Sequence, residues 1–221
     1  MADSAARAAA DGIRRELAGF TGGATDPAFA PDRELFGAYT HQQIWDMVHE
    51  ELDPAALGRT AQAWQANAHA VAEAFQVFSD ATNREFARWS GRAADAAVRA
   101  TREFVGASTE AHDVLRAVAR LMELNGDAAQ TIRGAIPAPQ RYRPLDDPAA
   151  EAVYGGKRRM DHDSAAADIE ADVRDTMTYV YTPTMPASGD HVPQFPRPQE
   201  GPAADTGASP DPGPCRGGGT R

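Results

Sequence analysis

The side chains that carry out most protein chemistry are present in this chain, but their spacing builds no recognisable metal site. No two histidines stand four residues apart, and none belongs to the His-Glu-x-x-His sequence that binds zinc on a helix. The histidines in question are His41, His49, His69, His112, His162 and His191. Asp161-His162-Asp163 lacks the glycine and the downstream glutamate of a calcium loop. The one cysteine, Cys215, excludes an internal disulfide and a zinc site built from several cysteines, so we predict no metal site.

Nucleophilic and phosphate-binding motifs are likewise missing from the sequence. Gly155-Gly156-Lys157 lacks the earlier glycine, the following Ser or Thr and the preceding strand of a phosphate-binding loop. No Gly-x-Ser-x-Gly elbow is present to hold a catalytic serine. We therefore predict no catalytic residues, no cofactor and no enzymatic activity. Lys157-Arg158-Arg159 is a basic run in an acidic protein, which indicates either a solvated helix face or a contact for an acidic patch of a partner.

The overall composition excludes two further classes of protein. The chain has 221 residues, with 32 acidic and 22 basic side chains and a net charge of −10. Such a charge argues against binding nucleic acid, which depends on a clustered basic face. No run of 18 apolar residues occurs, so we predict no transmembrane segment. The N-terminus has no basic region followed by an apolar one, which predicts a protein made in the cytoplasm without a cleavable signal peptide.

The chain divides into four segments by composition. Residues 1–38 contain an Ala-rich helical pattern followed by glycines and prolines, and we interpret them as a weakly ordered arm. Residues 39–136 form the organised part, and residues 137–181 begin with prolines before helical character returns. Residues 182–221 hold nine prolines and seven glycines with few apolar residues, which predicts a disordered tail.

Two helix starts are marked clearly in the organised part. Thr40 and Gln43 have the spacing of a capping box, which predicts a short helix over 41–48. Asp53-Pro54 combines a preferred capping residue with proline at the first helical position, and no further proline occurs before residue 137.

After Pro54, apolar residues recur at alternating three- and four-residue steps, the period of a long amphipathic helix. Ser90-Gly91 is the one clear break in this pattern. The spacing therefore predicts two helices, over 54–89 and 92–135, that fold back as an antiparallel hairpin. A third apolar series predicts a helix over 148–179 that packs along the hairpin. We expect an all-α protein with an elongated three-helix bundle.

A slender hairpin of this kind cannot hide all of its apolar residues. The third helix would cover them incompletely, because Gly156 and Asp163 interrupt its own apolar series. We expect the remaining stripe to bind a small helical-hairpin protein as a heterodimer, or a second copy of the chain, and to close a four-helix bundle. The candidate interface residues are Phe75, Phe78, Phe104, Val114, Val118 and Leu121.

The sequence around the break, Phe86-Ala-Arg-Trp89-Ser90-Gly91-Arg-Ala93-Ala94-Asp-Ala96, resembles the turn of the WXG family and of its larger relatives, the PPE proteins of actinobacteria. The resemblance covers about residues 54–136 and places Trp89-Ser90-Gly91 near the middle. The segment from Met177 to Pro186 also looks like sequence that follows such domains. No Pro-Pro-Glu occurs near the N-terminus, so the likeness is PPE-like rather than complete.

The resemblance implies a non-enzymatic substrate or accessory component of type VII (ESX-type) secretion, exported as a helical heterodimer to the cell surface or beyond. The family's export signal, Tyr-x-x-x-Asp/Glu, is matched literally only by Tyr142 and Asp146, a match that chance also produces. Two interpretations of Trp89 and Gly91 are possible from the sequence. Trp89 covers the end of the core while Gly91 permits the bend, or both are recognised by the secretion machinery. The alternative for the whole protein is a cytoplasmic helical scaffold or homodimer without an export role.

Overall fold

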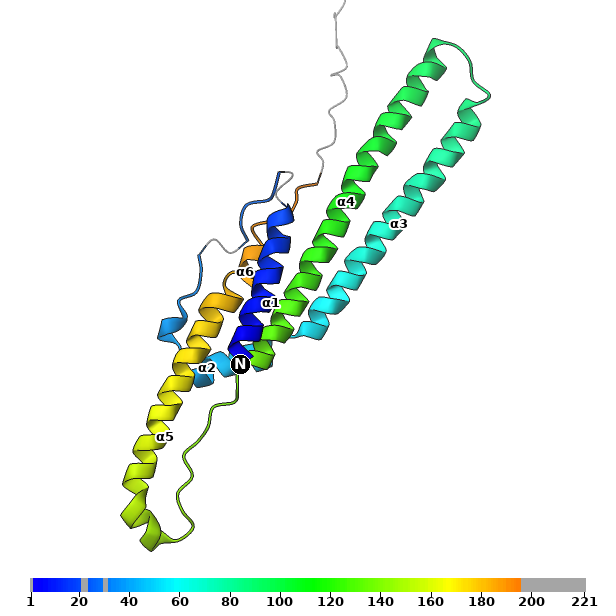
Figure 1. Cartoon of the computed structure of the whole chain (residues 1–221). Helices are drawn as coiled ribbons and strands as arrows, with labels where there is room; N and C mark the ends of the chain where they lie inside the picture. Colours follow the sequence, from blue (N-terminus) through cyan, green and yellow to red (C-terminus); the bar gives the residue numbers. More distant parts are fainter. Residues whose placement is uncertain (1, 21–23, 30–31, 196–221) are drawn as a thin grey trace, which may run out of the picture.

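The structure, a computed structural model, describes residues 2–20, 24–29 and 32–195, and these residues are almost entirely helical. Figure 1 shows the arrangement of the helices. The described part contains no β-strand beyond one isolated bridge between Thr25 and Pro193, so the predicted all-α class is confirmed. The α-helices are α1 (Ala2–Leu17), α2 (His41–Asp46), α3 (Pro54–Phe86), α4 (Arg92–Ala135), α5 (Pro148–Thr176) and α6 (Met185–Ser188). Short turns complete them, η1 (Ala18–Phe20), η2 (Phe36–Ala38), η3 (Met47–Glu51) and η4 (Met177–Tyr181).

Helices α3 and α4 are the longest elements and lie side by side (Figure 1). Helix α3 begins where the sequence marks it, because the Asp53 carboxylate accepts hydrogen bonds from the backbone amides of Ala55 (2.9 Å) and Ala56 (3.1 Å). These bonds satisfy donors that the first turn leaves without helical partners, and Pro54 needs none. Helix α4 follows after five residues, and Gly91 precedes it with a φ of 96°.

The hydrophobic core is concentrated on the C-terminal half of α4. Residues there face α1, η3 and η4 and are almost fully buried, namely Leu121, Leu124, Ala128, Ile132 and, just after the helix, Ile136. Ile44 and Val48 close the core from the segment that precedes α3, and Phe36 contributes from η2. The core therefore lies at the end of the α3–α4 pair that is remote from the link between the two helices (Figure 1).

Helix α1 is an integral part of this core, which corrects the interpretation of residues 1–38 as a weakly ordered arm. Its buried residues recur at three- and four-residue steps and lie on one face, namely Ala6, Ala10, Ile13 and Leu17. Arg120 of α4 binds both carboxylate oxygens of Glu16 and also Glu123, which fixes α1 against α4. The sequence showed the helical pattern but not its burial, because alanines bury area only when a partner surface is close enough to receive them.

Helix α5 packs against the core by its C-terminal end, so the predicted three-helix bundle along the hairpin is wrong for most of its length. Val173 and Thr176 are buried in the core together with Met177 of η4. The N-terminal part of α5 extends away from α3 and α4 (Figure 1), and Val153 and Met160 are exposed there. The prolines after α4 turn the chain away, so α5 starts far from the hairpin.

The segment 182–195 is ordered and packed, which corrects the predicted tail at its start. The side chain of Thr184 is fully buried, and its hydroxyl donates to the Val180 carbonyl at 2.6 Å. The backbone then pairs with the N-terminal segment, where Asp26 donates to Val192 at 2.8 Å and Gln194 donates to Ala24 at 3.0 Å. The rest of the predicted tail, 196–221, lies outside the described residues.

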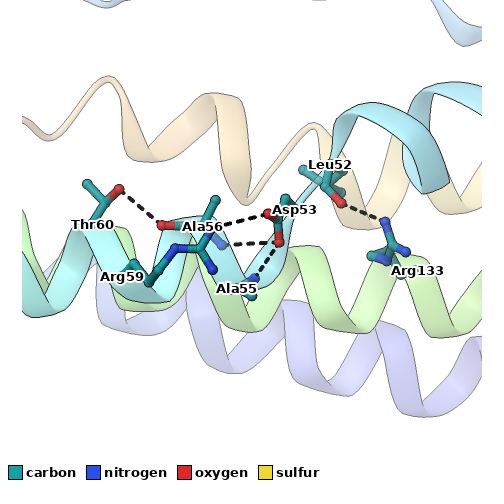
Figure 2. Close-up of polar contacts among 7 residues, drawn as sticks. All are labelled: Leu52, Asp53, Ala55, Ala56, Arg59, Thr60 and Arg133. Atoms are coloured by element: carbon teal, nitrogen blue, oxygen red, sulfur yellow. Dashed lines mark hydrogen bonds and ion pairs between the residues drawn. The ribbon is translucent and has the colours of Figure 1, made fainter.

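Arg133 ties the end of α4 to the segment that leads into α3 (Figure 2). One of its guanidinium nitrogens donates to the backbone oxygens of Val48 (2.9 Å), His49 (3.1 Å) and Leu52 (2.6 Å). These carbonyls belong to the π-helical turn η3 and its end, where helical acceptors lack amide partners. A single cation thus satisfies the turn and fixes where α3 starts relative to α4.

We expect Arg133→Met to lower the free energy of unfolding by about 2 kcal/mol, because it leaves partly buried carbonyls without a donor. Urea denaturation of the full chain measures the change. Arg99→Met is the matched control, since Arg99 is exposed on the same helix, and surface changes of this kind stay within about 0.5 kcal/mol. Equal effects of the two substitutions would contradict the role assigned to Arg133.

The cap of α3 should also make stability depend on pH. The amide of Ala56, followed by that of Ala55 and the charge of Arg59, lowers the pKa of Asp53. Because the folded pKa lies below the unfolded one, this contribution is present at neutral pH and is lost as the pH falls through the folded value. Asp53→Asn keeps the capping oxygen but does not titrate. We expect the advantage of the wild type over Asp53→Asn in urea midpoint to shrink between about pH 6 and about pH 3. A difference that stays constant would contradict this origin.

Candidate functional site

The link between α3 and α4 contains the two turn residues singled out in the sequence, Trp89 and Gly91. Gly91 has a φ of 96° and a ψ of 176°, a region that residues with a Cβ rarely adopt, so glycine is required there. Trp89 is 57% exposed and its ring contacts Phe86 edge-on at a centroid distance of 5.3 Å. The prediction that Trp89 covers the end of the core is wrong, because the core lies at the opposite end of the pair and no other described element reaches this link (Figure 1).

Three of the six candidate interface residues form an aromatic cluster across α3 and α4. The ring of Phe104 lies 5.3 Å from that of Phe75 and 5.6 Å from that of Phe78. Phe104 is 55% exposed and Phe78 is 40% exposed, so a large part of the cluster faces solvent. The structure thus brings these three residues together on the half of the pair that α1 does not cover. We call Phe75, Phe78 and Phe104 the aromatic stripe.

The other candidate residues lie closer to the core. Leu121 is buried beneath α1 as part of the hydrophobic core, and Val114 is also buried within the chain. The prediction that these two contact a partner is therefore wrong, because the N-terminal helix, taken for an arm, occupies part of that stripe. Val118 is half-buried. Val77 is 62% exposed next to Phe78 in the sequence. The sequence did not single it out, because it lies outside the series of apolar residues at three- and four-residue steps.

The contact between α3 and α4 next to the aromatic stripe is made by small residues. Ala68 of α3 and Ala94 and Ser108 of α4 are buried between the two helices. Small side chains allow close approach of the helix backbones but leave no space for larger ones. The phenylalanines are consequently placed at the edge of the contact rather than inside it.

Tyr142 and Asp146, the literal match to an export signal, lie in the connector before α5. The Tyr142 hydroxyl donates to Glu151 at 2.8 Å, and the Glu151 carboxylate also accepts from the Leu145 amide at 2.8 Å. The Leu145 amide and the Tyr142 hydroxyl lower the pKa of Glu151, whereas desolvation and the adjacent carboxylate raise the pKa of Tyr142. Asp146 is exposed. Tyr142 is therefore a structural anchor of the connector, with Glu151 as a partner that the motif did not indicate.

Gly155 permits this arrangement around Tyr142. A Cβ at position 155 would lie 2.6 Å from Cδ of Glu151, so a larger residue would displace the carboxylate from its hydrogen bonds. The aromatic ring of Tyr142 also contacts His162 edge-on at 5.6 Å and lies beneath the guanidinium of Arg159 at 4.8 Å. The connector is thus fixed to Glu151 and Gly155 in the first two turns of α5, and to Arg159 and His162 further along the helix.

Among the described residues, no cluster of three or more His, Cys, Asp or Glu side chains is arranged to hold a metal ion. No described helix is both long enough and apolar enough to cross a membrane. Cys215 lies outside the described residues. Of the residues predicted from the sequence, those that the structure brings together form the aromatic stripe on α3 and α4, and Tyr142 lies in a second group of contacts in the connector before α5.

Comparison with known proteins gave no match to a family model, to a curated protein or to a solved structure. The resemblance to WXG and PPE proteins therefore stays a prediction from the sequence motif.

The two turn residues should differ in their effect on stability. We expect Trp89→Ala to cost about 1 kcal/mol or less, because the indole is largely exposed. Gly91→Ala should cost about 1–3 kcal/mol, because alanine is strained at this φ and ψ. Leu124→Ala, which empties a buried site, provides the reference for a core residue at about 2–5 kcal/mol. Urea denaturation ranks the three variants, and a Trp89 effect as large as that of Leu124 would contradict the exposed placement.

Proposed function

We propose that this chain is a non-enzymatic, PPE/WXG-like interaction protein that binds a helical partner along α3 and α4 and serves as a substrate or accessory component of type VII secretion. The observation that carries the proposed binding to a helical partner is the aromatic stripe, three phenylalanines from two helices that remain in contact with solvent. Exposed apolar clusters of this kind mark interaction surfaces. The Trp-x-Gly sequence at the link supports the family assignment by resemblance.

The location of the stripe supports a helical partner. The C-terminal half of α4 is covered by α1, whereas α3 is the only described element beside residues 92–113, about 33 Å of helix (Figure 1). The two long helices lie side by side with the stripe along the edge of their contact, and a second helical hairpin packs against such a pair at a crossing angle of about 20°. The partner is therefore a small helical hairpin with an apolar face, and the product is a four-helix bundle on this half of the protein.

The secretion role rests on the family resemblance and not on the stripe. Export as a folded heterodimer agrees with a chain that keeps its own core at one end and offers a docking face at the other. The alternative is a helical scaffold or homodimer that stays in the cytoplasm and uses the same stripe for self-association. The two alternatives differ in the occupant of the stripe and in the location of the protein.

We expect the full chain to form a one-to-one complex with a short helical-hairpin protein encoded beside it, as measured by light scattering after co-expression. Phe78→Ser combined with Phe104→Ser should abolish the complex, because it removes the exposed apolar area while leaving the core intact. Val153→Ser combined with Met160→Ser is the control, since these residues are also apolar and even more exposed but lie on α5. A monomer with and without the neighbouring protein would contradict the proposal. A dimer of the chain alone that the stripe variant dissociates would favour the homodimer.

Export is tested separately in the host strain. We expect the protein in the culture medium or at the cell surface when the type VII ATPase is present, and only inside the cell when the gene for that ATPase is deleted. An identical distribution in both strains would contradict the secretion role and leave the cytoplasmic scaffold.

A further inference from the structure

A depression lies between the connector after α4 and the side of α5. It consists of two adjoining cavities of about 590 Å³ and 370 Å³, which share Pro139, Gln140 and His162 in their walls. The larger cavity is lined by three arginines, Arg141 and Arg143 of the connector and Arg158 of α5. Its volume lies within the range of small-molecule sites.

The charge of the larger cavity is opposite to that of the protein. Its lining contains three guanidinium groups and no carboxylate, although the chain as a whole carries a net charge of −10. Within the part of the chain that the structure describes, neither Arg141 nor Arg143 forms an ion pair. Arg158 has a long contact of 3.4 Å with Glu151, which is already occupied by Tyr142 and the Leu145 amide. Two of the three guanidinium groups in the lining, those of Arg141 and Arg143, therefore have no carboxylate partner among the described residues.

The wall of the cavity is fixed in place by packing and hydrogen bonds. Tyr142 is anchored to Glu151 and holds Arg158 and Arg159 over its ring, with guanidinium carbons 5.8 Å and 4.8 Å from the centroid. His162 contacts the edge of the same ring, and its buried Nε2 has no hydrogen-bond partner among the described residues. Of the three arginines in the lining, Arg158 is therefore held in place before a ligand binds, which reduces the ordering cost of binding.

We propose that this cavity binds the phosphate group of a small soluble molecule. A guanidinium group presents paired N–H donors that match two phosphate oxygens, and three such groups can surround one tetrahedral anion. A long polyanion or an anionic membrane is disfavoured, because the net negative charge of the rest of the chain repels extended negative surfaces. This binding site is separate from the aromatic stripe, and it does not depend on the partner proposed above.

The test is calorimetric titration of inorganic phosphate into the full chain, with ionic strength held constant by chloride. We expect saturable binding that Arg141→Gln combined with Arg143→Gln weakens by about tenfold or more, which corresponds to the loss of about 1.4 kcal/mol. Both arginines are exposed in the connector, so the fold should be retained, and circular dichroism verifies this. Arg99→Gln combined with Arg102→Gln removes the same charge from an exposed part of α4 and should leave the affinity unchanged within about twofold.

Three outcomes would overturn the proposal. The first is the absence of saturable phosphate binding. The second is an equal loss of affinity in both double variants, which would indicate general attraction by charge. The third is binding to vesicles of phosphatidylcholine that contain phosphatidic acid without any response to inorganic phosphate, which would identify a lipid headgroup as the source of the phosphate.

Discussion

The burial of the C-terminal half of α4 is the constraint on which the other elements of the fold depend. Leu121, Leu124, Ala128 and Ile132 are almost fully removed from water, and each fully buried aliphatic side chain contributes about 1.5–3 kcal/mol. No single neighbour covers this surface, since α1, η3 and η4 come from three distant parts of the chain. The N-terminal helix, the segment before α3 and the segment after α5 therefore meet on this one helix, and direct contacts between the N-terminal region and residues 177–195 add to their packing.

This concentration of the core leaves the other half of the α3–α4 pair with little to bury. Contacts there are made by Ala68, Ala94 and Ser108, which allow close helix approach and push the phenylalanines to the edge. The molecule thus combines a self-sufficient end with an end whose apolar residues remain accessible (Figure 1). That division suits the proposed docking role, because a chain with its own core stays folded while the aromatic stripe stays accessible.

Charged side chains determine where the helices begin and end around this core. Arg133 satisfies the carbonyls before α3, Arg120 holds α1 through Glu16, and Glu151 fixes the connector before α5 through Tyr142. Arg133 and Arg120 reach partners 81 and 104 residues away in the sequence, whereas Glu151 binds a tyrosine nine residues before it. Arg141 and Arg143 differ from these charged residues, because they line a cavity and pair with no carboxylate in the described part of the chain.

The sequence by itself determined the helical class, the starts of α2 and α3, the break near Ser90-Gly91 and the start of α5, because caps, prolines and apolar periodicity act within a few residues. It also indicated the apolar residues of the aromatic stripe. The tertiary structure decided which of the candidate interface residues stay exposed: Leu121 is buried in the core with α1, whereas Phe104, beside Phe75 and Phe78, remains 55% exposed. It likewise decided that Trp89 lies far from the core and that residues 182–195 pack. Such outcomes depend on which distant segment reaches a given surface, and local spacing carries no information about that.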